Sequence, residues 1–233
     1  MTAKIMNFHV VTIFPASLDS YLNESIVARA QKNNLIKIQA LNPRDFTTDK
    51  HHRVDDKPYG GGPGMAMLAE PILQTVEKIK KTAGPKTKTI IFAPGGKQFT
   101  NALARQWSKK YSDLILIAGR YEGIDGRVKK ILKADLSTKA LASVEEISIG
   151  PYVLSGGELP ALVVIDAVAR QIPGVLGNAD SPEENRASAD DIYTRPETLE
   201  WQGKKYRVPK ILLSGHHKNI EAWRESKNKK KLK

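Results

Sequence analysis

Short apolar segments alternate with helix-like segments over the first 176 residues, and this alternation limits the possible folds more than any other feature. Apolar or β-branched segments at residues 8–14, 36–41, 90–93 and 114–118 have the length of buried strands. Helices are predicted between and after them, at residues 25–33, 70–81, 101–110 and 158–170. Strands that alternate with helices form a mostly parallel sheet covered on both faces. The predicted fold class is therefore α/β over residues 1–176.

The composition excludes several classes of protein. The 233 residues include no cysteine, which excludes disulfides, a thiolate nucleophile, zinc–thiolate sites and iron–sulfur clusters. The longest apolar run, residues 114–118, is far shorter than the roughly 18 residues of a membrane helix. The N-terminal residues do not have the pattern of a signal peptide. We therefore expect a cytoplasmic protein without a membrane partner. The adjacent histidines at 51–52 and 216–217 diverge on a helix or strand, so no protein metal site is predicted.

The composition changes after residue 176. Residues 177–191 are polar and predict an interdomain linker. Residues 192–233 predict a small, mainly helical, basic C-terminal domain with a helix at residues 217–227. From residue 204 onward, 11 Lys and Arg stand against two acids, so this segment holds +9 of the net charge of +12. Trp201, Tyr206 and Trp223 interleave with these cations, which favours nucleic-acid binding. The alternative is a solvated tail that only aids solubility.

Four of the five residues at 60–64 are glycine, yet neither common phosphate-binding motif fits. Gln98 follows Gly96-Lys97 where a Walker loop needs Ser or Thr, and Met65 occupies the third glycine position of a dinucleotide fingerprint. Ordering so many glycines costs conformational entropy. Because charged residues cluster just before them, at 51–57, we interpret this segment as a substrate-facing loop. The alternative is a flexible surface loop.

Three loops follow predicted strands, at residues 94–97, 119–127 and 150–157. Ligands in parallel α/β sheets bind at the carboxyl ends of the strands, so these loops form the predicted site. In the third loop, Ser155 and Glu158 have capping-box spacing and predict a helix start. Asp166 and Arg170 stand four residues apart in that helix. They form either an intrahelical ion pair, or an arrangement in which Asp166 anchors Arg170 as it reaches into a site beside the linker.

Several strings of residues stand in one order along nearly the whole chain. They are PRDF at 43–46, VDDKPYGGGPGM at 54–65, AGRYEGIDGRV at 118–128, SIGPYVLSGGELPA at 148–161, RQIPGVLG at 170–177, YTRPE at 193–197 and VPKILLSGHHKNIEAWR at 208–224. Together they closely resemble the bacterial tRNA (guanine-N1)-methyltransferase family of the SPOUT superfamily, which methylates the guanosine at tRNA position 37. The resemblance implies a SPOUT-type parallel sheet with a deep trefoil knot, a homodimer, tRNA as partner and S-adenosyl-L-methionine as cofactor.

The same motifs imply which residues form the two binding sites. The cofactor pocket would be built from the three strand-end loops, that is, from Phe92, Ala93, Pro94, Gly95, Gly119, Tyr121, Glu122, Gly123, Ile149, Gly150, Pro151, Tyr152, Val153, Leu154, Gly156 and Gly157. The tRNA would be bound by Arg53, Asp55, Lys57, Gly60, Gly61, Lys210, His216 and Arg224. The resemblance also makes Mg²⁺ a possible cofactor near Glu122 or Asp125, although nothing in the residue spacing demands it.

The implied chemistry needs a base and an arginine. Guanine N1 must lose a proton, and a carboxylate in reach serves as base. Arg170 matches the family arginine that stabilises charge on guanine O6. Asn185 stands where the family has its proposed base, an aspartate, and a neutral amide cannot act as one. We predict that Glu184 acts as the base instead. The alternatives are the other acidic residues of the linker, Asp180, Asp190 and Asp191.

The chain departs from the family pattern in two further ways. Residues 133–143 form an insertion. The C-terminal domain is short, so we expect its binding of tRNA to depend more on charge. The sequence allows two alternative functions. The protein could be a methyltransferase of another RNA site, or an RNA-binding protein with altered or lost catalysis.

Overall fold

The computed structural model describes residues 5–134, 143–177 and 191–231 of the chain. Contacts divide it into two compact units, Met1–Gly177 and Asn178–Lys233. Within the described ranges, no helix is both long and apolar enough to cross a membrane.

A five-stranded sheet forms the centre of the first unit, as the alternating pattern predicts. Its strands are β2 (Ile36–Leu41), β1 (Met6–Val11), β6 (Asp113–Ile117), β5 (Thr87–Gln98) and β7 (Ser143–Ser148), in the order β2-β1-β6-β5-β7. Every pairing in this sheet is parallel. The α/β prediction is therefore confirmed. A strand was expected before the loop at 150–157, but no bounds were predicted for it, and the structure places it at β7. Strand β1 ends at Val11 rather than at residue 14.

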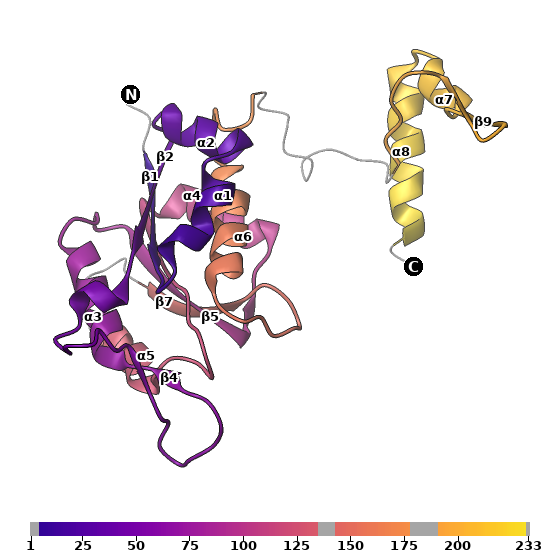
Figure 1. Ribbon diagram of the computed structural model, residues 1–233. Helices are drawn as coiled ribbons and strands as arrows, with labels where there is room; N and C mark the ends of the chain where they lie inside the picture. The colour runs from indigo at the N-terminus through magenta and orange to yellow at the C-terminus, as the bar shows by residue number, and fades with distance from the viewer. Residues whose placement is uncertain (1–4, 135–142, 178–190, 232–233) are drawn as a thin grey trace. The chain divides into compact units, whose positions relative to one another are not determined.

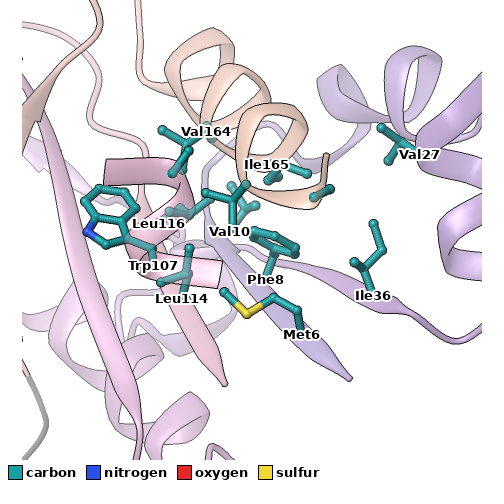
Figure 2. Close-up of a cluster of buried hydrophobic side chains, with 14 of the residues drawn as sticks. Met6, Phe8, Val10, Val27, Ile36, Trp107, Leu114, Leu116, Val164 and Ile165 are labelled. Atoms are coloured by element: carbon teal, nitrogen blue, oxygen red, sulfur yellow. The ribbon is translucent and has the colours of Figure 1, made fainter. Parts of the chain in front are cut away.

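Helices cover both faces of this sheet (Figure 1). One face carries α1 (Asp19–Leu22), α2 (Ser25–Lys32), α4 (Asn101–Lys110) and α6 (Glu158–Ala169). The other carries α3 (Ala69–Lys80) and α5 (Gly126–Ala134), of which α5 was not predicted. Because side chains alternate along a strand, β1 supplies both faces: Phe8 and Val10 pack in one apolar cluster and Val11 in the other. Figure 2 shows Phe8 and Val10 lying against Ile165 of α6.

Strand β5 continues past the point where a loop was expected. Its pairing with β7 shifts between Phe92 and Lys97, both of which lie opposite Ile147. The predicted loop at 94–97 is therefore an irregularity inside a longer strand. The bulge brings Gly96 against the β7 backbone, where a Cβ would lie 2.7 Å from the carbonyl carbon of Glu146. A local apolar pattern cannot indicate a strand that resumes after a bulge.

Short elements connect the sheet to the glycine-rich loop. The 3-10 helices η1 (Pro15–Leu18) and η2 (Pro43–Phe46) follow β1 and β2. Strands β3 (Asp55–Asp56) and β4 (Ala66–Met67) then pair antiparallel and close the base of the loop at residues 57–65.

The second unit holds β8 (Thr198–Trp201), β9 (Lys204–Arg207), α7 (Lys210–Leu213) and α8 (His217–Lys231). The strands form an antiparallel hairpin. Helix α8 begins where the sequence predicts it and runs further. The hairpin was not predicted. None of the side chains that the structure describes in this unit is buried.

Candidate active site

A cavity of about 370 Å³ lies at the carboxyl ends of β6 and β7 and beside the irregularity in β5. All the residues predicted for the cofactor pocket line it except Gly95 and Pro151. The structure thus brings together three loops that are far apart in the sequence. Its volume falls in the range of about 300–1,000 Å³ that is usual for small-molecule sites.

Backbone contacts hold the second and third loops together. The Gly157 N–H donates to the Gly119 carbonyl at 2.9 Å, and Arg120 and Gly156 form an isolated β-bridge. A Cβ at residue 157 would lie 2.5 Å from the Cα of Ala118. Residue 157 must therefore be glycine for the two loops to approach this closely.

A buried ion pair crosses the same junction. The Glu158 side chain is almost fully buried, its residue being 5% exposed, and its Oε2 lies 3.0 Å from Nε of Arg120. The hydroxyl of Thr12 donates to Oε1 of Glu158 at 2.7 Å. Arg120 also donates from Nη1 to the Ser155 carbonyl at 3.3 Å, and its guanidinium lies 4.7 Å from the centroid of the Phe14 ring. The end of β1, both loops and α6 are thereby joined.

This ion pair replaces the predicted capping box. The N-cap of α6 is Gly157, and no side chain caps the helix. Glu158 is the first residue of α6, and its carboxylate is committed to Arg120 and Thr12 rather than to the helix backbone. The S-x-x-E spacing was therefore misread, because the Glu158 partners lie far away in the sequence.

The wall formed by the third loop is apolar and accessible. Tyr152, Val153 and Leu154 all line the cavity and are exposed. Exposed apolar side chains gathered in a concave site are typical of ligand-binding surfaces.

The glycine-rich loop returns beside this cavity. The Glu122 N–H donates to the Met65 carbonyl at 3.0 Å, and the Met67 N–H donates to the Gly123 carbonyl at 2.9 Å. At Gly64, which has a φ of +92°, a Cβ would lie 2.8 Å from Cγ of Glu122. The substrate-facing interpretation gains support from this neighbourhood, since the loop touches the residues that line the pocket.

The predicted tRNA-binding residues in and just before this loop are accessible, but Arg53 is already paired with a carboxylate. Lys57, Gly60 and Gly61 are exposed, and Asp55 is half-buried in β3. The Arg53 guanidinium pairs with Asp49 at 2.9 Å. Its hydrogen bonds hold the pKa of the Asp49 carboxyl far below the usual range.

The described residues provide no evident metal site. They contain no group of three or more His, Asp or Glu side chains placed to hold a metal ion. Asp125, one of the acids considered for Mg²⁺, accepts a hydrogen bond from Nε of Arg127 at 3.0 Å. The hydrogen bond from the Arg127 side chain lowers the pKa of the Asp125 carboxyl.

Arg170 follows α6, and its backbone N–H donates to the Asp166 carbonyl at 3.0 Å. Burial raises the pKa of the Tyr21 hydroxyl, and the neighbouring Asp166 carboxylate raises it further, whereas the charge of Arg170 lowers it. Asp166 therefore also faces Tyr21 of α1, and this contact does not decide between the two interpretations of the Asp166–Arg170 pair.

Some predicted residues fall elsewhere. Glu184, Asn185, Asp180 and Asp190 lie outside the described residues, as does most of the predicted insertion, residues 135–142. Asp191 is described and exposed. Lys210, His216 and Arg224 are all exposed in the second unit.

The cavity is also lined by residues that were not among the predicted cofactor residues: Ile91, Arg120, Ile124, Glu146, Ile147, Ser148, Ser155 and Pro160. Arg120, Ile124 and Ser155 lie in loops that were assigned to the site, and the other five were missed. Most of them lie within one or two residues of a predicted cofactor residue. Adjacency to the three loops was therefore a usable signal for most of this set.

A parallel α/β sheet with a ligand-sized cavity beside three adjacent strands places the chain among α/β proteins whose architecture suits small-molecule binding. The chain belongs to the family described as tRNA (Guanine-1)-methyltransferase TrmD, whose model matches residues 6–233. The expected resemblance is confirmed.

Curated relatives support the same family over most of the chain. A tRNA (guanine-N(1)-)-methyltransferase of Pseudoalteromonas atlantica is 45% identical over 95% of this chain and 79% of its own length. The protein of the same name from Desulforamulus reducens is 46% identical over 94% of this chain and 82% of its own length. That from Thermomicrobium roseum is 48% identical over 94% and 77%, respectively.

Proposed function

We propose that this protein transfers a methyl group from S-adenosyl-L-methionine to N1 of the guanosine at position 37 of tRNA. The observation that carries the proposal is the convergence of three loops on one cavity beside the glycine-rich loop. Membership of the TrmD family supports the reaction and the RNA substrate. When bound, the cofactor supplies an electrophilic methyl group on a sulfonium.

The cavity suits such a cofactor by its lining. Tyr152, Val153 and Leu154 offer apolar surface to a flat adenine ring, and the glycines of the second and third loops expose main-chain N–H and C=O groups. Gly123 has a φ of +133°, and a Cβ added there would meet nothing within 4 Å, so its backbone stands open toward a ligand. These loops would bind the cofactor and orient it.

The remaining steps concern the guanine. Arg170 would donate hydrogen bonds to O6 and hold the charge that develops there. Glu184 would take the proton from N1, because the amide of Asn185 cannot. The glycine-rich loop, whose end touches Glu122, would bring the RNA to the cavity. No step is assigned to a metal ion, and Mg²⁺ stays a possible addition only.

Three further features are proposed for the whole molecule. The third loop, which packs against residues 118–120, and α6 would form the trefoil knot of the SPOUT superfamily. The chain would have a methyltransferase domain at 1–176, a linker at 177–191 and a tRNA-binding domain at 192–233, and it would act in the cytoplasm, where its substrate is found.

A homodimer is proposed through one apolar surface. Half-exposed apolar side chains stand just before η1, on α1 and on α6, where α6 contacts η1: Phe14, Tyr21, Leu159 and Val163. Exposed apolar side chains in one place mark an interface. A symmetric dimer would cover them and would place two copies of α6 together.

The test is methyl transfer from labelled cofactor to a tRNA with guanosine at position 37 and to the same tRNA with adenosine there. Transfer to the first alone is expected. Transfer to both would indicate another RNA site. Transfer to neither, with the cofactor still bound, would favour an RNA-binding protein that has lost catalysis. The only support for that alternative is the natural Asn185 at the position of the family aspartate.

Arg170 is the residue to vary first. We expect Arg170→Ala to lower turnover by roughly 100-fold or more with cofactor affinity unchanged, since it would remove one charge-stabilising donor. Arg170→Lys, which keeps the charge but not the fork of donors, should recover part of the rate. Full turnover by a stable Arg170→Ala protein would show that this role is wrong.

A further inference from the structure

The hairpin of β8 and β9 is short and well formed. Its ladder pairs Thr198 with Arg207 and Trp201 with Lys204. The two turn residues, Gln202 and Gly203, have φ values of +50° and +72°, the signature of a tight two-residue turn. Just beyond the ladder, the Val208 N–H donates to the Glu197 carbonyl at 2.9 Å.

The register sorts the side chains onto two different faces. Directly paired residues project to the same face, and the next pair projects to the other. The pairs Leu199–Tyr206 and Trp201–Lys204 therefore form one face, called here the ring face. The opposite face carries the other pairs, including Glu200 and Lys205, which form a salt bridge at 3.0 Å.

The ring face is apolar and open. Leu199 is 52% exposed, Trp201 62% and Tyr206 54%. A two-stranded hairpin alone is only marginally stable in water. Apolar side chains that stay exposed to water add little to its stability. None of the side chains described in this unit is buried, and the part of the unit that the structure describes leaves both aromatic residues, Trp201 and Tyr206, more than half uncovered.

Charge indicates what covers them. Lys204 is the only charged residue of the ring face, while Lys205 and Arg207 flank it from the opposite face. A dry protein interface disfavours lysine. Rings that share a face with a lysine, on a hairpin with further cations, instead suit unpaired nucleotides, whose bases stack on the rings and whose phosphates meet the cations.

We propose that the ring face binds unpaired bases of an RNA strand, with Trp201 and Tyr206 as stacking platforms and Lys204 as a phosphate contact. This inference rests on the proposed function for its source of RNA, namely the tRNA substrate. It assigns to the hairpin a different task from the phosphate attraction that the basic segment supplies as a whole.

The test uses the full chain and measures tRNA affinity as a function of salt. In Trp201→Thr and Tyr206→Thr the ring is lost while a good strand former remains, so the hairpin should persist. Each change should weaken binding by about 5- to 100-fold, the range measured for base–aromatic stacking, and leave the slope of affinity against salt unchanged. Lys204→Gln should reduce that slope by about 0.7, as expected for one contact to a single strand.

Two controls sharpen the result. Trp201→Phe keeps a ring and should retain most of the affinity, whereas Glu200→Gln alters only the opposite face and should not weaken binding. A double Trp201→Thr, Tyr206→Thr protein that binds tRNA within two-fold of the parent would overturn the inference. So would a double variant whose self-association changes while its RNA affinity does not, because the rings would then face a second copy.

The inference and the proposed function can fail separately. A parent chain that methylates no tRNA would refute the proposed function, and the ring face could still be tested with a single-stranded RNA oligonucleotide against its duplex. If the parent chain methylates tRNA and the double variant binds it normally, only the ring-face inference fails.

Discussion

The two units of the chain differ in what holds them together. In Met1–Gly177, two clusters of buried apolar side chains flank the sheet, and a buried ion pair ties the site loops. In Asn178–Lys233, none of the described side chains is buried, and Trp201 is among the most exposed aromatic residues. Hydrophobic burial is the main stabilising term of folding, so the first unit has a source of stability that the described part of the second lacks. We infer from this difference that the first unit keeps a cavity in shape, while a bound partner would complete the second.

The sharpest way to break this comparison is to truncate one leucine in each unit. Leu116→Ala, in fully buried β6, should cost about 2–5 kcal/mol of unfolding free energy, because it leaves a cavity. Leu199→Ala, in the exposed hairpin, should cost about 0.5 kcal/mol or less. Denaturant unfolding of both proteins measures the difference. Equal losses would mean that the second unit has a core of its own.

A second prediction concerns the ion pair between the site loops. Glu158→Gln leaves the Arg120 guanidinium without its carboxylate in a largely buried place, and should cost about 2–3 kcal/mol of unfolding free energy. The change should also weaken cofactor binding, because it removes the ion pair that joins the second and third loops. Glu77→Gln, on the exposed side of α3, is the matched control and should stay within about 0.5 kcal/mol. An unchanged Glu158→Gln protein would show that backbone contacts alone hold the loops.

The sequence predicts the sheet and the site unequally well, and particular residues show why. Strand β2 and helix α4 have the predicted bounds, because their patterns are local. The strand before the loop at 150–157 was given no bounds, since Glu145 and Glu146 interrupt the apolar pattern of β7. Lys88 Nζ lies 2.7 Å from Oε2 of Glu145, and Lys129 pairs with Glu146, so both charges are satisfied by residues distant in sequence.

In the candidate site, too, some features follow from the local sequence and others depend on residues that are distant in the sequence. The three loops follow from the rule that ligands bind at the carboxyl ends of parallel strands, and the family motifs supplied the individual residues. Arg120 and Glu158 were missed as partners, because nothing in the spacing of residues 119–127 and 150–157 shows which side chains meet. The pairing follows from the burial of the Glu158 carboxylate, because a carboxylate buried this deeply requires a cation beside it.

The smallest predicted effect is a pH dependence confined to the first unit. Burial raises the pKa of the Asp113 carboxyl, but hydrogen bonds from His9, Ser112 and the Gly84 N–H outweigh this, and the net pKa is lowered. A lowered pKa stabilises the fold above the unfolded value, about 3.9, and that stabilisation is lost as the pH falls through the folded value. Asp113→Asn should therefore lose less stability below pH 4 than the parent chain. Parallel curves of unfolding free energy against pH would contradict this.

Amide hydrogen exchange of the full chain, alone and with each ligand, tests the division of labour between the units most directly. We predict that S-adenosyl-L-methionine slows exchange in the loops at 92–95, 119–125 and 149–157 and leaves residues 198–207 unchanged. We predict that tRNA slows exchange at 198–207. Cofactor protection of 198–207 equal to that of the loops, or no protection of the loops, would contradict the account.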